Sequence, residues 1–316
     1  MTILHLVRPV LDPAGRGASD AQAVVCSAAI AAAPGLRHRV LIIGGERARR
    51  RAYSMGLHSH GSVGTLLGRS LGLGRLVARV ARAWNANDTL QVYGPEEAEL
   101  AEATSIRHVE RMDCSARVIP GETAEYPSIR DFGGATITRS QARAMLGCDE
   151  SEFVVLALGD PPSEVEAHPV GEMLGMLTVG GVPVVGVFPS GAKGLFRVAR
   201  HAREGYVRRV RAFECPVWGV LPAADLAVVS PASNGITLAT RLLVRHAARL
   251  GIAVVIPHAA GVGVPTGAVI RADDDCGARL ASACHRWLKT GRALVSWPPG
   301  EESTIGAAIA ARWTRG

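Results

Sequence analysis

Short apolar runs of strand length alternate along the chain with longer amphipathic stretches. This alternation is typical of parallel sheets whose faces are covered by helices. The runs predict strands at residues 2–7, 39–43, 89–92, 106–111, 153–158, 182–188, 217–220, 226–229, 253–256 and 268–270. The amphipathic stretches predict helices at residues 19–33, 140–146, 195–201, 238–250 and 277–288. Each half of the chain therefore predicts a Rossmann-like α/β sheet.

The two halves are separated by a stretch rich in proline, glycine and charged residues, from Ile119 to Gly134. The chain has 316 residues, which is more than one hydrophobic core usually serves. We therefore expect an N-terminal domain at residues 1–120 and a C-terminal domain at 121–295. The last segment, 296–316, is expected to form a helix that packs back on the N-terminal domain.

Composition excludes several classes of protein. Hydrophobic residues make up 48% of the chain and charged residues 20%, as in ordinary globular proteins, so disorder is not the main state. No apolar run reaches the roughly 18 residues of a membrane span, and the N-terminus lacks the flank of a signal peptide. The six cysteines show no Cys-x-x-Cys spacing, so we expect reduced thiols in a cytoplasmic protein and no metal site.

The net charge of +7 invites a search for an acidic partner. Five Phe, five Trp and four Tyr are too few for stacking platforms, so nucleic acid is not the expected partner. Arg75, Arg79 and Arg82 fall at helical spacing, which suits peripheral contact with the inner membrane face or a phosphate ligand, but also a plain solvated helix. The run from Arg47 to Arg51 is expected to be a solvated face.

The turn after the first predicted strand carries Gly15, Arg16 and Gly17. Glycines let backbone N–H groups approach an anion, and the start of the following helix adds partial positive charge. The full Gly-x-Gly-x-x-Gly pattern is not met, because position 20 is Asp. A phosphate or acceptor loop and a plain tight turn therefore both fit this segment.

A second irregular segment, residues 55–74, is rich in glycine and contains His58 and His60. It can be interpreted as a mobile loop that closes over a substrate and supplies a histidine as base. The simpler interpretation is a flexible surface loop that precedes a basic helix.

Four segments, in order, resemble motifs of the retaining glycosyltransferases of family 4. The sequence RVIPGE at 117–122 is similar to that family's v-i-P-N-G-v-D linker, and SQARAMLG at 140–147, running on to FVVLALG at 153–159, resembles R-x-x-L-G … f-v-v-l-f-v-G-R. LPAADL at 221–226 with SPASNG at 230–235 resembles a-D-l-f-v-x-P-S-x-x-E-G-f, and AARLGIAVV at 247–255 is similar to E-A-M-A-x-G-x-P-V-V. Together the motifs span roughly residues 117 to 290.

The resemblance implies a GT-B fold, in which two Rossmann-like domains face each other across a cleft. It implies a nucleotide-sugar donor on the C-terminal domain and a carbohydrate or lipid-linked acceptor on the N-terminal one, with no metal and no further cofactor. The residues that would bind the donor are Gly159, Ser233, Asn234, Gly235, Ile236, Thr237 and Arg245. Arg241, Arg245 and Arg249 also share one helix face, a spacing that favours a solvated face.

The chain departs from the family at the positions that carry charge. Where the family has an Arg and a Lys for the donor pyrophosphate, residues 159–166 contain Asp160, Glu164 and Glu166, which would repel it. Lys193 follows the next strand and is out of order for that role. No Asp or Glu occurs at 226–272, so both of the family's paired glutamates are absent. Asp113 lies near the place of a catalytic His-Asp pair, but Met112 precedes it.

Three functions remain open. The first is a glycosyltransferase that uses a nucleotide sugar, with Asp113 as candidate catalytic residue. The second is a non-catalytic scaffold or regulatory subunit of an active glycosyltransferase, which the missing charges favour. The third is another phosphate-ligand enzyme of the same fold, such as an epimerase or a phosphorylase-like enzyme. The sequence does not specify the sugar, the acceptor or the oligomeric state.

Overall fold

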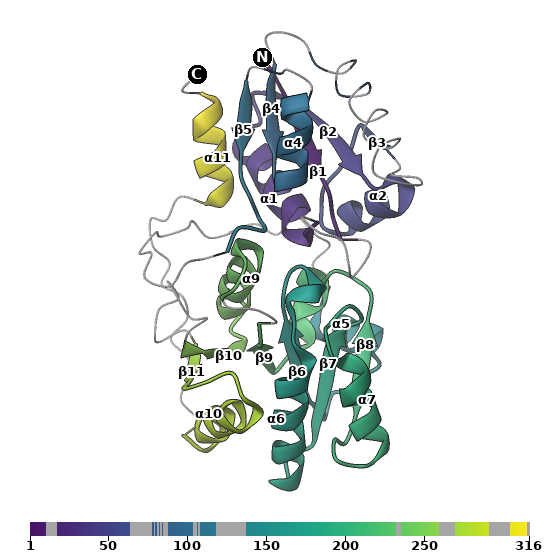
Figure 1. Cartoon of the computed structure of the whole chain (residues 1–316), viewed down its shortest axis with the longest axis vertical. Coiled ribbons are helices and arrows are strands. Elements are labelled where there is room, and N and C mark those ends of the chain that lie inside the picture. Colours follow the sequence, from purple (N-terminus) through teal and green to yellow (C-terminus); the bar gives the residue numbers. More distant parts are fainter. Residues whose placement is uncertain are drawn as a thin grey trace. The chain divides into compact units, whose positions relative to one another are not determined.

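The chain divides into two compact units, seen in the computed structural model of Figure 1. Unit 1 comprises Met1–Ala116, Tyr126–Ala135 and Glu301–Gly316, and unit 2 comprises Arg117–Glu125 and Thr136–Gly300. The structure describes residues 1–10, 18–63, 78, 80, 82, 84, 88–103, 106, 108–117, 137–231, 235–258, 269–290 and 304–314. The C-terminal segment thus returns to the unit in which the chain begins.

Unit 1 is built on a five-stranded parallel sheet of order β3-β2-β1-β4-β5. Its strands are β1 (Thr2–Val7), β2 (Arg37–Ile43), β3 (Gly61–Val63), β4 (Thr89–Val92) and β5 (Val109–Arg111). Strand β1 is central and buried apart from its first residue, which explains why it is apolar except for Thr2 and His5. This is the strand order of a Rossmann sheet, and the order reverses between β1 and β4.

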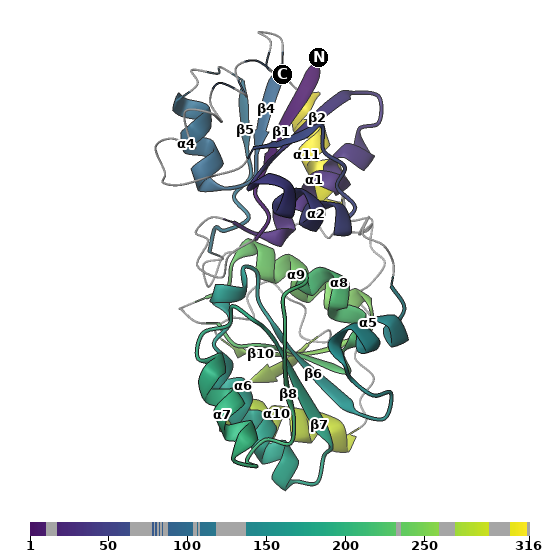
Figure 2. The ribbon, with the colours of Figure 1, turned by 90° about the vertical axis from the view of Figure 1, so that its right-hand side faces the viewer.

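Helices cover both faces of that sheet (Figure 2). The helices α1 (Asp20–Ala32), α2 (Gly45–Ser54) and α11 (Ile305–Trp313) lie on one side, and α4 (Pro95–Ala103) lies on the other. Helix α11 packs closely on α1, since a Cβ added at Gly306 would lie 2.3 Å from the carbonyl oxygen of Ala28. The expected helix in 296–316 that returns to the N-terminal domain is confirmed at Ile305–Trp313.

A buried chain of polar groups in unit 1 lies against α11. His5 Nδ1 lies 2.9 Å from the Tyr93 hydroxyl, His5 Nε2 lies 3.0 Å from His38 Nδ1, and His38 Nε2 lies 2.9 Å from the Ala33 carbonyl oxygen. Because that carbonyl accepts, neutral rings have one consistent arrangement: His38 donates to Ala33, His5 to His38, and Tyr93 to His5. Trp313 of α11 packs its ring edge-on against His5.

Unit 2 repeats this plan with a six-stranded parallel sheet of order β11-β10-β9-β6-β7-β8. The strands are β6 (Phe153–Leu158), β7 (Val184–Pro189), β8 (Val210–Phe213), β9 (Leu226–Val229), β10 (Ala253–Pro257) and β11 (Ile270–Ala272). Figure 2 shows α5 (Arg139–Leu146), α8 (Val217–Val220) and α9 (Leu238–Arg249) on one face, and α6 (Ala167–Val179), α7 (Leu195–Arg203) and α10 (Gly277–Thr290) on the other.

A buried arginine joins α5 to the start of β6. The Arg143 side chain is 1% exposed and donates to the carbonyls of Asp149, Glu150 and Glu152 and to Asp225 Oδ2, the last at 2.6 Å. The same carboxylate oxygen accepts the backbone N–H of Val154, at 2.7 Å. A buried charge is tolerated only when it is paired and hydrogen-bonded, as Arg143 is.

The predicted fold class, two Rossmann-like α/β sheets, is confirmed. The strand predicted at 217–220 is wrong, because these residues form the short helix α8 after Pro216. A short apolar run does not distinguish a buried strand from a buried helix, and Trp218 is 1% exposed. The elements β3, β8, α2, α4 and α6 were not predicted.

Burial makes the contribution of His5 to the stability of unit 1 sensitive to acid. Burial, with a smaller effect of His38, lowers the pKa of His5 to about 3. The unfolded chain binds a proton at His5 below pH 6.5 and the folded chain does not, so stability falls as pH falls from 6.5 towards 3. Lowering the pH from 7 to 5 should cost unit 1 about 2 kcal/mol through this residue.

Denaturant unfolding at both pH values checks this expectation. The His5→Gln variant cannot titrate at this position and should lose about 2 kcal/mol less than the parent between pH 7 and 5. His285→Gln, at an exposed position of α10, is the matched control and should leave the dependence unchanged. An equal acid sensitivity in His5→Gln and the parent would contradict the assignment.

Candidate functional site

The carboxyl ends of β6 and β9 form the switch point of unit 2, where open α/β sheets bind ligands. Gly159 follows β6 directly, and the chain then folds back over it. A Cβ added at Gly159 would lie 2.4 Å from Val165 Cγ2, so only glycine fits this close approach. The backbone N–H of Glu166 donates to the Ser230 carbonyl beyond β9 at 2.8 Å, which joins the two strand exits.

Two threonines of the α9 N-terminus clamp the backbone of Asp160. Thr237 caps the helix by accepting the N–H of Thr240 at 3.1 Å, and its hydroxyl donates to the Asp160 carbonyl at 2.7 Å. The Thr240 hydroxyl accepts the Asp160 N–H at 3.0 Å. All three residues are buried. The start of α9 is therefore fixed against the exit of β6, and its N–H groups add partial positive charge there.

The turn before α9 is held by Arg117. Gly235 adopts a left-handed φ of 79°, which favours glycine, and Ile236 is buried. Arg117 pairs through a β-bridge with Thr237, donates to the Gly235 carbonyl at 3.2 Å and forms a 2.7 Å ion pair with Glu164. Of the predicted donor-binding residues, Gly159, Gly235, Ile236 and Thr237 are thus brought together, while Ser233 and Asn234 lie outside the described residues.

Two of the three acids in the stretch 159–166, Asp160 and Glu164, have side-chain partners within unit 2. Asp160 is 1% exposed, and its Oδ2 accepts the indole N–H of Trp218 at 2.9 Å. The charge of Glu164 is balanced by Arg117. The predicted repulsion is therefore offset at Glu164 by the charge of Arg117, while Asp160 is buried with a hydrogen bond to Trp218.

The arginine stripe of α9 is not a solvated face. Arg241 is 0% exposed and Arg245 is 4% exposed, and only Arg249, in the last turn, is exposed. Nearly the whole helix is buried around its circumference, so the spacing of its arginines did not mark an outer face. Two guanidinium groups thus lie buried within the first two turns of the helix that begins at the switch point.

Burial and the Arg249 charge lower the pKa of His246 to about 4, so this ring, which lies against Trp218, is neutral at physiological pH. The positive charge of α9 is therefore carried by its arginines.

Sequence order concealed two further neighbours of the site. Lys193 follows β7, but its backbone pairs with the β6–α6 segment: its N–H donates to the Val165 carbonyl at 2.8 Å, and its carbonyl accepts from Ala167 at 2.8 Å. Ser230 follows β9, and its buried hydroxyl has no hydrogen-bond partner among the described residues. The adjacency of parallel strands is the signal that could have indicated Lys193, whereas Ser230 opens the SPASNG segment at 230–235.

In unit 1, the helix after the first turn begins with a paired carboxylate. Gly15, Arg16 and Gly17 lie outside the described residues, but Asp20 at the start of α1 is 1% exposed. Its two oxygens accept from Nε and NH2 of Arg51, each at 2.7 Å. The prediction of a solvated run at 47–51 is wrong for Arg51, whose side chain is 15% exposed.

The glycine-rich segment is described only up to residue 63. His60 accepts the Val40 N–H on Nδ1 at 3.2 Å and donates its own N–H to the Val40 carbonyl, so it continues the pairing at β2. His58 packs near the Tyr53 ring. Arg75 and Arg79 lie outside the described residues, and Arg82 is exposed.

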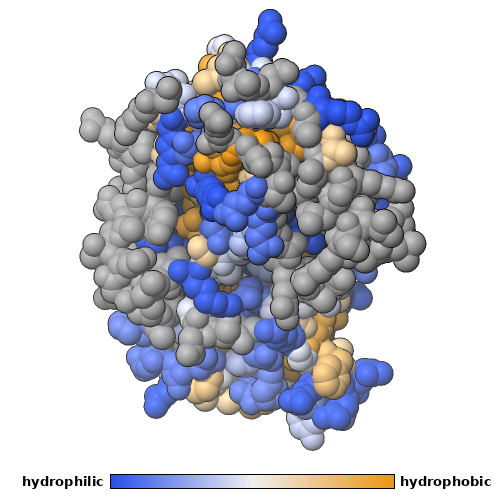
Figure 3. Space-filling view, turned by 45° about the horizontal axis from the view of Figure 1, so that its top comes forward, coloured by the Kyte–Doolittle hydropathy of each residue, from blue (hydrophilic) through white to orange (hydrophobic). Residues whose placement is uncertain are grey.

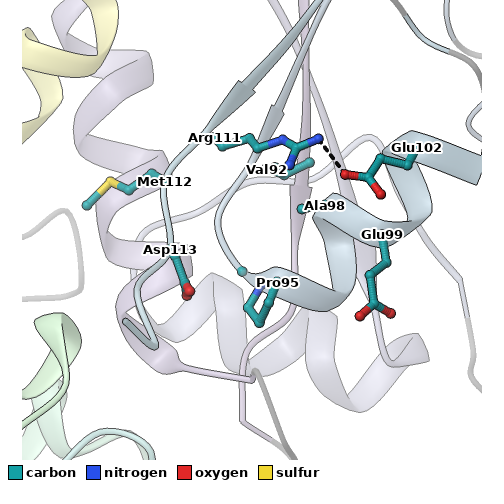
Figure 4. Close-up of a pocket in the computed structure, with 9 residues that line it drawn as sticks. Val92, Pro95, Ala98, Glu99, Glu102, Arg111, Met112 and Asp113 are labelled. Carbon is teal, nitrogen blue, oxygen red and sulfur yellow. Dashed lines mark hydrogen bonds and ion pairs between the residues drawn. The ribbon is translucent and has the colours of Figure 1, made fainter. Parts of the chain in front are cut away.

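Asp113 lines a cavity of about 320 Å³ at the carboxyl ends of β4 and β5 (Figure 4). Its Oδ1 accepts from the N–H and the hydroxyl of Ser115, at 2.8 and 2.6 Å. Glu99 and the Arg111–Glu102 ion pair line the same cavity.

Nearby on α4, burial raises the pKa of Glu97 to about 7, against the opposing effect of Arg8. The burial of Glu97 was not predicted, because an acidic residue in the first turn of a helix is common and gives no signal of its own.

Within the described ranges, no group of three or more His, Cys, Asp or Glu residues has the arrangement of a metal site. Over the same part of the chain, no helix is long and apolar enough to cross a membrane.

No family model and no curated protein matches the sequence. Solved structures do match across almost the full chain. They include UDP-GlcNAc 2-epimerase from Methanocaldococcus jannaschii (12% identity, TM-score 0.61, 100% of both chains) and a glycosyltransferase from Rickettsia africae ESF-5 (10%, 0.56, 98% of this chain and 91% of the other). HepE from Anabaena, solved in complex with UDP, is 15% identical with a TM-score of 0.55 over 100% and 95%. The chain therefore has the GT-B fold shared by these transferases and epimerases.

Removal of the Thr237 hydroxyl should destabilise unit 2. Thr237→Val keeps the volume but loses the cap and leaves buried backbone groups unpaired, so we expect a loss of about 1–2 kcal/mol in unfolding free energy. Thr237→Ser should retain most of the stability. Thr138 caps α5 at an exposed position, so Thr138→Val should cost less. Equal denaturation midpoints for Thr237→Val and Thr237→Ser would refute the clamp.

Proposed function

We propose that the chain binds a nucleotide sugar at the switch point of unit 2 and transfers the sugar to an acceptor hydroxyl. The observation that carries this proposal is the α9 N-terminus, held at the exits of β6 and β9 beside Gly159 and preceded by the left-handed turn at Gly235. Such a helix end binds phosphate through its N–H groups and dipole. The UDP-bound state of HepE, a protein with the same fold, is consistent with it.

The charges around this helix support an anionic ligand. Arg241 and Arg245 are buried in α9, and the helix begins with threonines, whereas the charge of Arg117 is balanced by its ion pair with Glu164. The Asp160 carboxylate is buried and accepts the indole N–H of Trp218, so its Oδ2 is engaged within unit 2. We assign Gly159, Ser233 to Thr237 and Arg245 to the donor, with Lys193 as a further cation, and no metal or other cofactor.

The acceptor belongs to unit 1 in this proposal. Transfer to a hydroxyl releases a proton, and Asp113 on the cavity of Figure 4 is the carboxylate we assign to accept it. The acceptor is a carbohydrate or lipid-linked hydroxyl, with Gly15, Arg16 and Gly17 beside it. Retention of configuration, as in glycosyltransferase family 4, is part of the proposal. The six free cysteines suit a reducing, cytoplasmic setting.

A non-catalytic glycosyltransferase-like scaffold is the second candidate. It is favoured by the absence of any Asp or Glu at 226–272, the segment where two carboxylates would be expected from the family resemblance. The resemblance in fold to an epimerase keeps epimerase chemistry as a third candidate. Both ligand-using candidates require the nucleotide, whereas the scaffold does not.

Thermal shift with UDP, GDP, ADP and their sugars tests the site. At a ligand concentration of 100 times Kd, binding stabilises the folded chain by about 2.7 kcal/mol, which is easily measured. We expect one nucleotide series to raise Tm. No shift with any of them at millimolar concentration would overturn the proposed function.

A pair of glycine variants locates the binding. Gly235 and Gly251 have similar left-handed φ angles, 79° and 75°, and a Cβ at Gly251 would meet nothing within 4 Å. Gly235→Ala and Gly251→Ala should therefore each lose about 1 kcal/mol of stability. Only Gly235→Ala should reduce the nucleotide-induced shift. An equal nucleotide-induced shift in both variants would place the nucleotide elsewhere. A separate assay distinguishes a transferase from a scaffold: only a transferase should release the nucleotide from the sugar donor when acceptor is added.

A further inference from the structure

Helix α7 and strand β8, at one edge of the unit 2 sheet, present an amphipathic surface that the proposed function does not use. Phe196 is 70% exposed at the start of α7, and Tyr206 is 68% exposed beyond its end. Phe196, Arg200 and Arg203 are spaced i, i+4 and i+7, so they share one face of the helix. One large aromatic ring is thus exposed on a helix face that carries arginines, and a second is exposed beyond the end of the same helix.

A groove of about 480 Å³ lies beside Phe196. It runs between α7 and β8, and its walls are mainly aliphatic, with Leu195, Ala199, Val210 and Ala212. Strand β8 pairs only with β7 among the described strands, so this groove is at a sheet edge. On the face in view in Figure 3, hydrophobic residues emerge in limited patches on a mainly hydrophilic surface.

The charge around the groove is positive. Exposed arginines at 197, 200, 203, 208 and 211 outnumber the exposed acids of the same segment, Glu204 and Glu214. The Arg197 guanidinium carbon lies 5.6 Å from the centroid of the Phe196 ring, a cation–π contact that keeps a positive charge beside this ring. The exposed Arg200–Glu204 pair, at 3.7 Å, adds little cohesion and leaves the segment cationic.

These features fit one kind of partner. Aliphatic walls suit hydrocarbon better than nucleobases, which stack on aromatic planes. A second copy across a two-fold axis would set arginine against arginine, which is unfavourable. Exposed aromatic rings beside arginines on a surface helix are typical of a helix that lies in an anionic membrane interface. We propose that the α7–β8 surface docks on anionic lipid, with Phe196 inserted among the acyl chains.

Vesicle flotation with the full chain tests this proposal. We expect binding to vesicles that contain phosphatidylglycerol, weak binding to pure phosphatidylcholine, and loss of binding as salt screens the charges. Phe196→Ser should weaken binding by roughly tenfold or more, because it removes the apolar anchor. Arg203→Glu should also weaken it by roughly tenfold, since it reverses one charge at the surface.

Matched controls lie on the opposite face of the same sheet. Met145→Ser removes an exposed apolar side chain of α5, and Arg249→Glu reverses a charge in the last turn of α9, as Arg203→Glu does in α7. Both controls should bind vesicles like the parent. All four variants change exposed residues, and their Tm values serve as the check that the fold is intact.

Three results would overturn the proposal: no binding to anionic vesicles, equal binding to neutral ones, or equal weakening by the controls and the α7 variants. Light scattering adds a fourth. A parent dimer that Phe196→Ser converts to a monomer would make this face a self-interface instead. Vesicle binding is measured without nucleotide, so a failure to bind vesicles does not count against the proposed nucleotide site. A failure to bind nucleotide likewise does not count against membrane docking.

Discussion

The geometry of unit 2 depends on the two hydroxyl groups that hold the backbone of Asp160. A parallel sheet of this strand order leaves a crevice where the strand order reverses, but topology alone does not fix how a helix enters it. Thr237 and Thr240 do so, because one hydroxyl caps α9 and both bond to the chain that leaves β6. The helix end, the Gly159 approach and the Arg117 bridge then have fixed positions relative to one another.

The strands and most of the long helices were predictable because burial imposes a pattern on them. Buried parallel strands such as β6 and β9 are continuous apolar runs, β1 is apolar except for Thr2 and His5, and the predicted ranges of all three match the structure. Helix α2 escaped prediction because its sequence GERARRRAYS buries only Ala48 and Ala52, too little to show a period. Edge strand β8 was missed for a related reason, since its exposed Arg211 and Ala212 break the run.

The candidate site was harder to predict because its charges are paired across the fold. The sequence shows that Asp160 and Glu164 are acidic. It does not show that Trp218 donates a hydrogen bond to Asp160 or that Arg117 forms an ion pair with Glu164. The spacing of Arg241 and Arg245 indicates a common helix face but not whether that face meets solvent. Separations of tens of residues along the chain, such as that between Asp160 and Trp218, leave no local pattern for sequence analysis to detect.

The Asp20–Arg51 pair makes the two halves of this chain electrically unlike, although their sheets have the same strand order. Helix α1 starts with the buried carboxylate of Asp20, which already interacts with the partial positive charge of the helix N-terminus. Helix α9 starts with hydroxyl groups and carries two buried guanidinium groups. The N-terminus of α9 is consequently a more favourable place for an anion than the N-terminus of α1.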